Sequence, residues 1–172
     1  QRMKGNRNYM KSEKKDISHT KRIKQDGIFA AILIILGMIK IPSIFPGAEF
    51  QLSAPYAVCL ASMVGFKRYF AIGICASFIQ LILGTHTIYN VAVAMIFRVV
   101  AGVIIKWCPF SKVALIIAGP IGTTCARIVM AYIFSLPILP LLAAAFPGMI
   151  FTMVVVVLLN QAVKRVIIQT AL

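Results

Sequence analysis

The most constraining feature of the chain is a series of six apolar stretches separated by short polar turns, which begins at Gly27 and ends near Arg165. Apolar residues make up 60% of the 172 positions and charged residues only 13%, and the mean hydropathy is +0.93. Soluble domains of this length do not normally have that balance. Because a spanning helix needs about 20 apolar residues, the sequence predicts an all-α membrane protein, a six-transmembrane-helix bundle.

Breaks in the apolar pattern set the limits of the expected spans. Prolines, glycines and paired basic residues cause these breaks. The expected spans are residues 27–39, 51–64, 69–83, 88–106, 113–134 and 140–163. The second span is too short to cross a hydrocarbon core of about 30 Å comfortably. We therefore expect the proline- and glycine-rich segment before it, residues 41–53, to dip into the protein as irregular backbone.

Charge divides the chain into three parts. The net charge is +14, and nine of the 18 Lys and Arg residues lie in the first 24 positions. Residues 1–25 are a basic tail that we expect to derive partly from cloning, residues 26–166 form the membrane domain, and residues 167–172 form a short C-terminal end. Basic residues gathered in this way are typical of topology signals and anionic-lipid contacts, so we expect a membrane partner and no nucleic acid.

The positive-inside rule then orients the bundle. Apart from the tail, basic pairs occur in the turns at residues 67–68 and 106–112 and at residues 164–165. All of these fall on one side of a six-span arrangement. We therefore expect both termini in the cytoplasm of a multi-pass protein of the plasma membrane, of bacterial type.

Two arginines lie inside expected spans, where a charge is costly and usually faces a cavity or a partner. At 1.5 Å per residue, Arg98 lies roughly 15 Å and Arg127 roughly 10 Å from the outer ends of their helices. Either arginine could instead bond helix carbonyls or pair with the one nearby acid, Glu49. Two arginines against one acid leave a surplus positive charge, which suits an anionic or acceptor-rich solute.

The expected outer turns add polar groups near the arginines. Glu49 and Gln51 alternate with apolar residues where the second span begins, and His86 and Asn90 flank the start of the fourth. Together with Arg98 and Arg127, they predict a substrate pocket that opens outward and has a polar rim. Ordinary polar loop chemistry is the alternative.

Enzyme and metal signatures are missing from the sequence. It contains no G-x-S-x-G, no H-E-x-x-H and no phosphate loop. The only histidine besides His86 is His19 in the tail, whereas a metal site needs several ligands. We expect no enzymatic activity, no metal and no cofactor, so any energy input comes from a gradient or from another subunit.

Residues 24 to about 165 resemble the substrate-binding (S) components of energy-coupling factor vitamin transporters. The likeness rests on the basic tail, six helices in a short chain, the segment 41–53 before a short second helix, and small residues at the start of the first helix. In that family the first helix has an A-x-x-x-A motif that docks on a coupling subunit. Here Ala30 is followed four positions later by Ile34, and Gly27-x-x-x-Ala31 takes the place of the motif.

The resemblance implies a small-molecule substrate and several protein partners. The chain would capture a vitamin or cofactor precursor, such as a cobalamin precursor or another aromatic heterocycle, and would topple in the membrane to release it inside. It would dock through Gly27, Ala30 and Ala31 on a transmembrane coupling subunit, and two ATPase subunits would supply the energy.

Two other functions fit the residues. One is a self-sufficient secondary transporter, which would usually show inverted repeats and coupled acids. The other is a non-transporting membrane scaffold or sensor, in which both arginines are purely structural.

Overall fold

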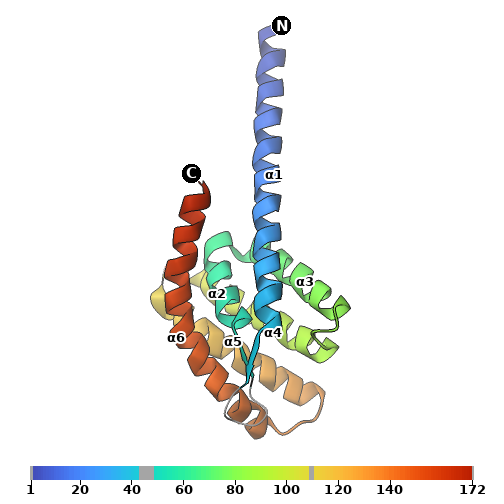
Figure 1. Ribbon diagram of the computed structural model, residues 1–172, viewed down its shortest axis with the longest axis vertical. Coiled ribbons are helices and arrows are strands. Elements are labelled where there is room, and N and C mark those ends of the chain that lie inside the picture. The colour runs from blue at the N-terminus through green and yellow to red at the C-terminus, as the bar shows by residue number, and fades with distance from the viewer. Residues whose placement is uncertain (1, 43–48, 109–110, 172) are drawn as a thin grey trace.

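The computed structural model describes the backbone of residues 2–42, 49–108 and 111–171, and the side chains of residues 20–39, 52–108, 111–162 and 165. Six helices follow one another along this part of the chain (Figure 1). They are α1 (Arg2–Met38), α2 (Ser53–Val64), α3 (Phe66–Ile82), α4 (Ile88–Trp107), α5 (Lys112–Ile133) and α6 (Ile138–Ala171).

A pair of three-residue strands interrupts the helical pattern. β1 (Lys40–Pro42) and β2 (Glu49–Gln51) pair antiparallel between α1 and α2, with Ile41 opposite Phe50. β-Branched and aromatic residues favour extended backbone. The expectations of an all-α chain and of irregular backbone throughout residues 41–53 were therefore wrong at these two short strands, although helices make up most of the fold.

Three of the described helices are long and apolar enough to cross a membrane, namely α4, α5 and the Ile138–Ala162 part of α6. α2 is apolar but has only 12 residues, a length of about 18 Å. The chain is thus helical with membrane-spanning character. The count of six spans and the cytoplasmic placement of both termini remain predictions. The N-terminal end of α1 and the C-terminal end of α6 project from the same side of the bundle (Figure 1).

Both terminal helices are longer than predicted. α1 begins at Arg2 rather than near residue 27, and α6 continues to Ala171 rather than ending near residue 163. Lys, Arg, Gln and Met are good helix formers, and no proline interrupts either extension. The basic tail and the C-terminal end are therefore helical. A fall in hydropathy along the sequence shows where a helix can leave the membrane, but the helix itself can continue beyond that point.

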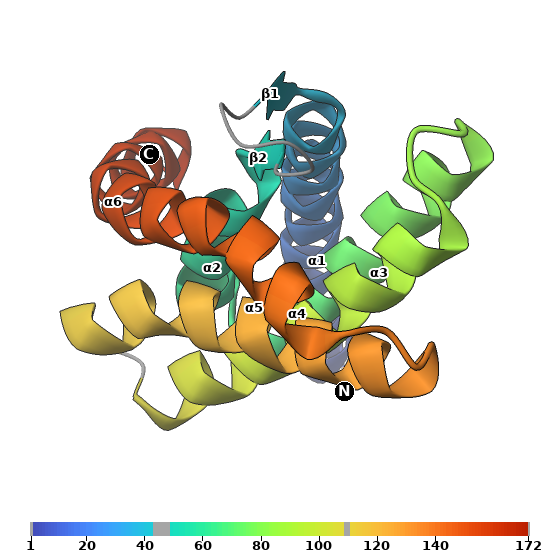
Figure 2. The ribbon, with the colours of Figure 1, turned by 90° about the horizontal axis from the view of Figure 1, so that it is seen from below.

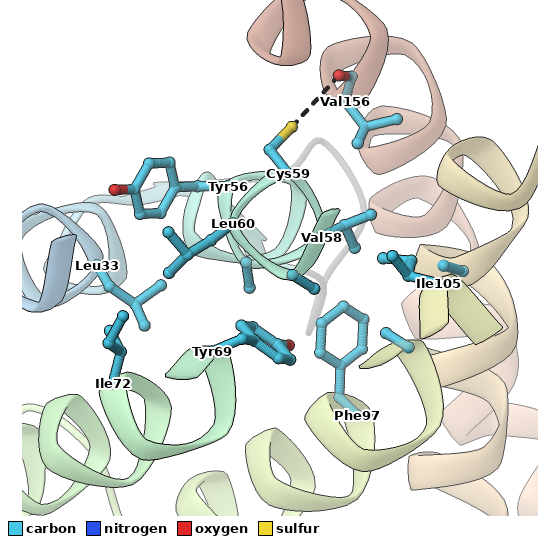
Figure 3. Packing of buried hydrophobic residues seen from close by; sticks show 14 of the residues in the cluster. Leu33, Tyr56, Val58, Cys59, Leu60, Tyr69, Ile72, Phe97, Ile105 and Val156 are labelled. Carbon is cyan, nitrogen blue, oxygen red and sulfur yellow. Dashed lines mark hydrogen bonds between the residues drawn. The ribbon is translucent and has the colours of Figure 1, made fainter. Parts of the chain in front are cut away.

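α2 is the central helix of the bundle. Its residues from Pro55 to Ala61 are all buried, as expected for a helix that is apolar on every side. Figure 3 shows it surrounded by side chains of four other helices, which include Leu33, Tyr69, Ile72, Phe97 and Val156. The thiol of Cys59 lies 3.5 Å from the carbonyl oxygen of Val156. A helix enclosed by protein in this way need not match the thickness of a bilayer.

α4 and α5 lie side by side, and α5 also packs on α6 (Figure 2). Each of the two helices begins with a capping side chain, because the hydroxyl of Thr87 accepts from the N–H of Asn90 and that of Ser111 accepts from the N–H of Ala114. Where they meet, a Cβ on Gly122 would lie 2.9 Å from the ring of Phe97. This close approach brings the polar faces of α4 and α5 to one cavity.

Candidate binding pocket

The described residues enclose a cavity of about 340 Å³ to which all six helices contribute. A volume of this size falls in the range of small-molecule sites. Its polar lining consists of Ser53, Gln80, His86, Tyr89, Asn90, Arg98, Thr123, Arg127 and Thr152. Its apolar lining consists of Leu33, Ala54, Val93, Ala94, Phe97, Ala144, Ala145 and Gly148. No Asp or Glu belongs to the described part of this lining, so the cavity has a positive potential.

Arg98 lies at the wall between α4 and α3. It is only 5% exposed, and its Nη1 donates a hydrogen bond to the hydroxyl of Ser77. A Cβ on Gly73 would lie 2.6 Å from Cδ and 2.7 Å from Nε of the arginine. Gly73 and Ser77 therefore hold this guanidinium against α3, a contact different from the carbonyl or Glu49 partner considered from the sequence.

Arg127 enters the same cavity from α5. Its Nε is buried and has no hydrogen-bond partner within the described part of the chain. Buried polar groups are hydrogen-bonded in the great majority of proteins, because an unsatisfied buried donor costs about 1 to 3 kcal/mol. An acceptor oxygen on a bound solute would remove that cost.

Two side chains of the pocket also fasten the end of α1. Gln80 Nε2 donates to the carbonyl oxygen of Ile34 at 3.2 Å, and His86 Nε2 lies 3.3 Å from the carbonyl oxygen of Gly37. Gly37 lies in the last turn of α1, where carbonyl groups lack partners within the helix. The contact calls for a proton on Nε2 of His86, which leaves Nδ1 of His86 and Oε1 of Gln80 for other partners.

Four of the six predicted binding residues line this cavity: His86, Asn90, Arg98 and Arg127. The backbone of Glu49 and Gln51 forms β2, and their side chains lie outside the described residues. That these residues bind substrate remains a prediction.

Sequence reasoning missed the contribution of α3. Gly73, Ser77 and Gln80 are all buried and occur at positions i, i+4 and i+7, so they share one face of the helix. A small and polar face on an otherwise apolar helix was the signal that could have located them. Thr123 and Thr152 were also missed, and no comparable spacing marks them.

The predicted docking residues on α1 lie on two different faces. Gly27 and Ala31 are exposed, and a Cβ on Gly27 would meet no atom within 4 Å. Ala30 is half-buried and packs against the core. Only Gly27 and Ala31 are therefore free on the exposed face, and docking on a partner remains a prediction.

Comparison with known proteins gives one informative likeness. No protein-family model matches the chain. A stretch of 106 residues is 50% identical to Protein BioX of Lysinibacillus sphaericus and covers 62% of this chain. The match spans 64% of the relative's own length. The chain is thus similar to Protein BioX over somewhat less than two thirds of that protein.

Proposed function

We propose that the chain is the substrate-capturing membrane subunit of an energy-coupling factor importer, and that its substrate is an organic acid of the vitamin or vitamin-precursor class. One observation carries this proposal. Arg98 and Arg127 line a single cavity inside the bundle, and no acid accompanies them among the described lining residues.

The electrostatics of the cavity favour an anionic solute. A guanidinium removed from water is stabilised by a carboxylate, which can accept two parallel N–H bonds from it. Hydrogen bonds to charged groups contribute about 1.5 to 3 kcal/mol each. Arg127 has an unpartnered buried Nε, so a carboxylate at this point would satisfy a donor that the described protein groups leave open.

The proposed partners follow from what the chain lacks. It contains helices suited to a membrane but no nucleotide-binding motif, so import driven by ATP would use ATPases on other chains. We propose two ATPase subunits and a transmembrane coupling subunit that docks on the exposed face of Gly27 and Ala31. The proposed location is a bacterial plasma membrane, with both termini in the cytoplasm.

Biotin is the first compound to test. Its free carboxylate would meet the arginines, and its ureido ring offers donors and acceptors for neutral polar groups such as Asn90. The name of the relative, Protein BioX, is a second reason to begin with this vitamin.

Two measurements test the proposal. Affinity purification of the full chain from a bacterium with its native partners should co-isolate a membrane protein and two ATPases. Purified chain should bind a carboxylate vitamin or precursor, and Arg127→Gln should weaken that binding at least tenfold. Arg22→Gln, which changes an exposed arginine, is the matched control and should bind normally. A chain that recruits no ATPase and binds no organic acid would overturn the proposal.

A further inference from the structure

We infer from the register of α4 that the pocket takes an elongated monocarboxylate with an apolar middle and an uncharged polar head. This inference rests on the proposed function and specifies its substrate class. α4 faces the cavity with residues at positions i, i+3, i+4, i+7 and i+8, which share one helix face. They are Asn90, Val93, Ala94, Phe97 and Arg98.

The chemistry of that face changes along the helix. Asn90 lies near the first turn of α4, Val93 and Ala94 lie one turn further, and Phe97 and Arg98 follow in the next turn. The face is therefore neutral and polar at one end, apolar in the middle and cationic at the other end. A solute that matches it has a hydrogen-bonding head, a hydrocarbon body and an anionic end.

Neighbouring helices add polar, cationic and small residues to the cavity around this face. Gln80 lies in the last turn of α3 and His86 in the connection to α4, both near the Asn90 end of α4, and both line the cavity. Arg127 joins Arg98 in the cavity, and α6 adds the small residues Ala144 and Ala145. The polar head would thus meet amide and imidazole groups, while two guanidinium groups would converge on one carboxylate.

Helix geometry brackets the length of the solute. From Asn90 to Arg98 the rise along α4 is about 12 Å, but an arginine side chain tilts toward the N-terminus of its helix and shortens that span. On α3, Ser77 accepts the hydrogen bond from Arg98 and precedes Gln80 by three residues, a rise of about 4.5 Å along the helix. The distance from carboxylate to head therefore lies between roughly 5 and 12 Å.

A series of synthetic acids tests this inference with the full-length purified chain. The probes are the monoamides of succinic, adipic, suberic and sebacic acids, which have one carboxylate, a growing hydrocarbon body and a neutral amide head. Each is compared with the alkanoate of equal length, which lacks the head, with its methyl ester, which lacks the charge, and with the free diacid, which has two charges. Equilibrium binding is measured by calorimetry.

The expected result is an optimum at an intermediate chain length, with the monoamide bound more tightly than the alkanoate, the ester or the diacid. Asn90→Ala should weaken the best monoamide about tenfold and leave the alkanoate nearly unchanged, whereas Arg127→Gln should weaken both. Ile88→Ala is the control, because Ile88 lies in the same turn of α4 and is 77% exposed.

Different binding results overturn the inference and the proposed function. If acids bind with no preference for length or head, or if the diacid binds best, the inference is overturned and the proposed function stands. If neither these acids nor biotin binds, the inference is overturned, and if the chain also recruits no ATPase, the proposed function fails with it.

Discussion

Arg98 on α4 donates a hydrogen bond to the hydroxyl of Ser77 on α3, and both side chains are at least nine-tenths buried. The bond joins two helices at the wall of the cavity. Ser77→Ala would leave a guanidinium N–H without this partner, so we expect a loss of about 1 to 3 kcal/mol in unfolding free energy together with weaker binding of an anionic solute. Chemical denaturation and calorimetry measure the two effects.

Ser62→Ala is the matched control for that variant. The hydroxyl of Ser62 donates to the carbonyl oxygen of Cys59 in the same helix, so its loss breaks a local contact only. Equal effects of the two variants on solute binding would contradict the role of Ser77 in positioning Arg98.

Gly73→Ala should disturb the same arginine from the same face of α3. The added Cβ would lie 2.6 Å from Cδ of Arg98, and the guanidinium would have to move away from Ser77. We expect a lower thermal midpoint and reduced affinity for anionic solutes.

Gly27→Ala is the control, because it places a Cβ in open space. It should leave the thermal midpoint unchanged or slightly raised, because alanine has a higher helix propensity than glycine. A Gly73→Ala protein as stable and as active in binding as Gly27→Ala would refute the prediction.

Two further glycines should differ in their tolerance of alanine. At Gly102 a Cβ would lie 2.7 Å from the ring of half-buried Phe66 and 3.3 Å from the ring of fully buried Tyr69. Both are rigid rings and one is enclosed in the core, so the cost should reach about 1 to 3 kcal/mol. At Gly37 a Cβ would meet the amide nitrogen of Gln80. The flexible side chain of Gln80 can move away, and the cost is then its hydrogen bond to the carbonyl oxygen of Ile34. Thermal unfolding should therefore rank Gly102→Ala as the less stable variant, and the reverse order would contradict this packing.

The ion pair between Asp26 and Arg68 ties α1 to the first turn of α3. Its side chains are 30% and 34% exposed, so water screens the attraction. Asp26→Asn should lower the unfolding free energy by no more than about 1 kcal/mol, and the difference should shrink in concentrated salt. A loss that matched Gly102→Ala and persisted in concentrated salt would show that the pair matters far more than its exposure suggests.

Sequence reasoning located α4 and α5 to within a residue or two. Helix caps and breakers flank both, notably Thr87, Ser111 and the turn after Trp107, so local chemistry fixes their ends. The same reasoning misplaced the N-terminal end of α1 and the C-terminal end of α6, because polar residues end the membrane-spanning part of a helix without ending the helix itself. It also left out β1 and β2, whose pairing joins residues on either side of the segment 43–48.

The sequence predicted those pocket residues whose type is rare inside an apolar span. Arg98 and Arg127 stand out because charges inside apolar spans are uncommon, and both line the cavity. Ser77 and Gln80 could not be assigned in the same way, since polar uncharged residues are common in such helices. Their spacing marks one face of α3, but which helices that face meets depends on the packing of α3 against α1 and α4.

The central claim is that the arginines of the cavity hold an acidic solute. Its most direct test is mass spectrometry of the small molecules that remain bound to mildly purified chain, compared with Arg127→Gln and the Arg22→Gln control prepared from the same cells. We predict one organic acid that is retained at a near-stoichiometric level by the wild-type chain and by Arg22→Gln and is lost from Arg127→Gln. The account would be contradicted if all three proteins retained the same molecules at the same level.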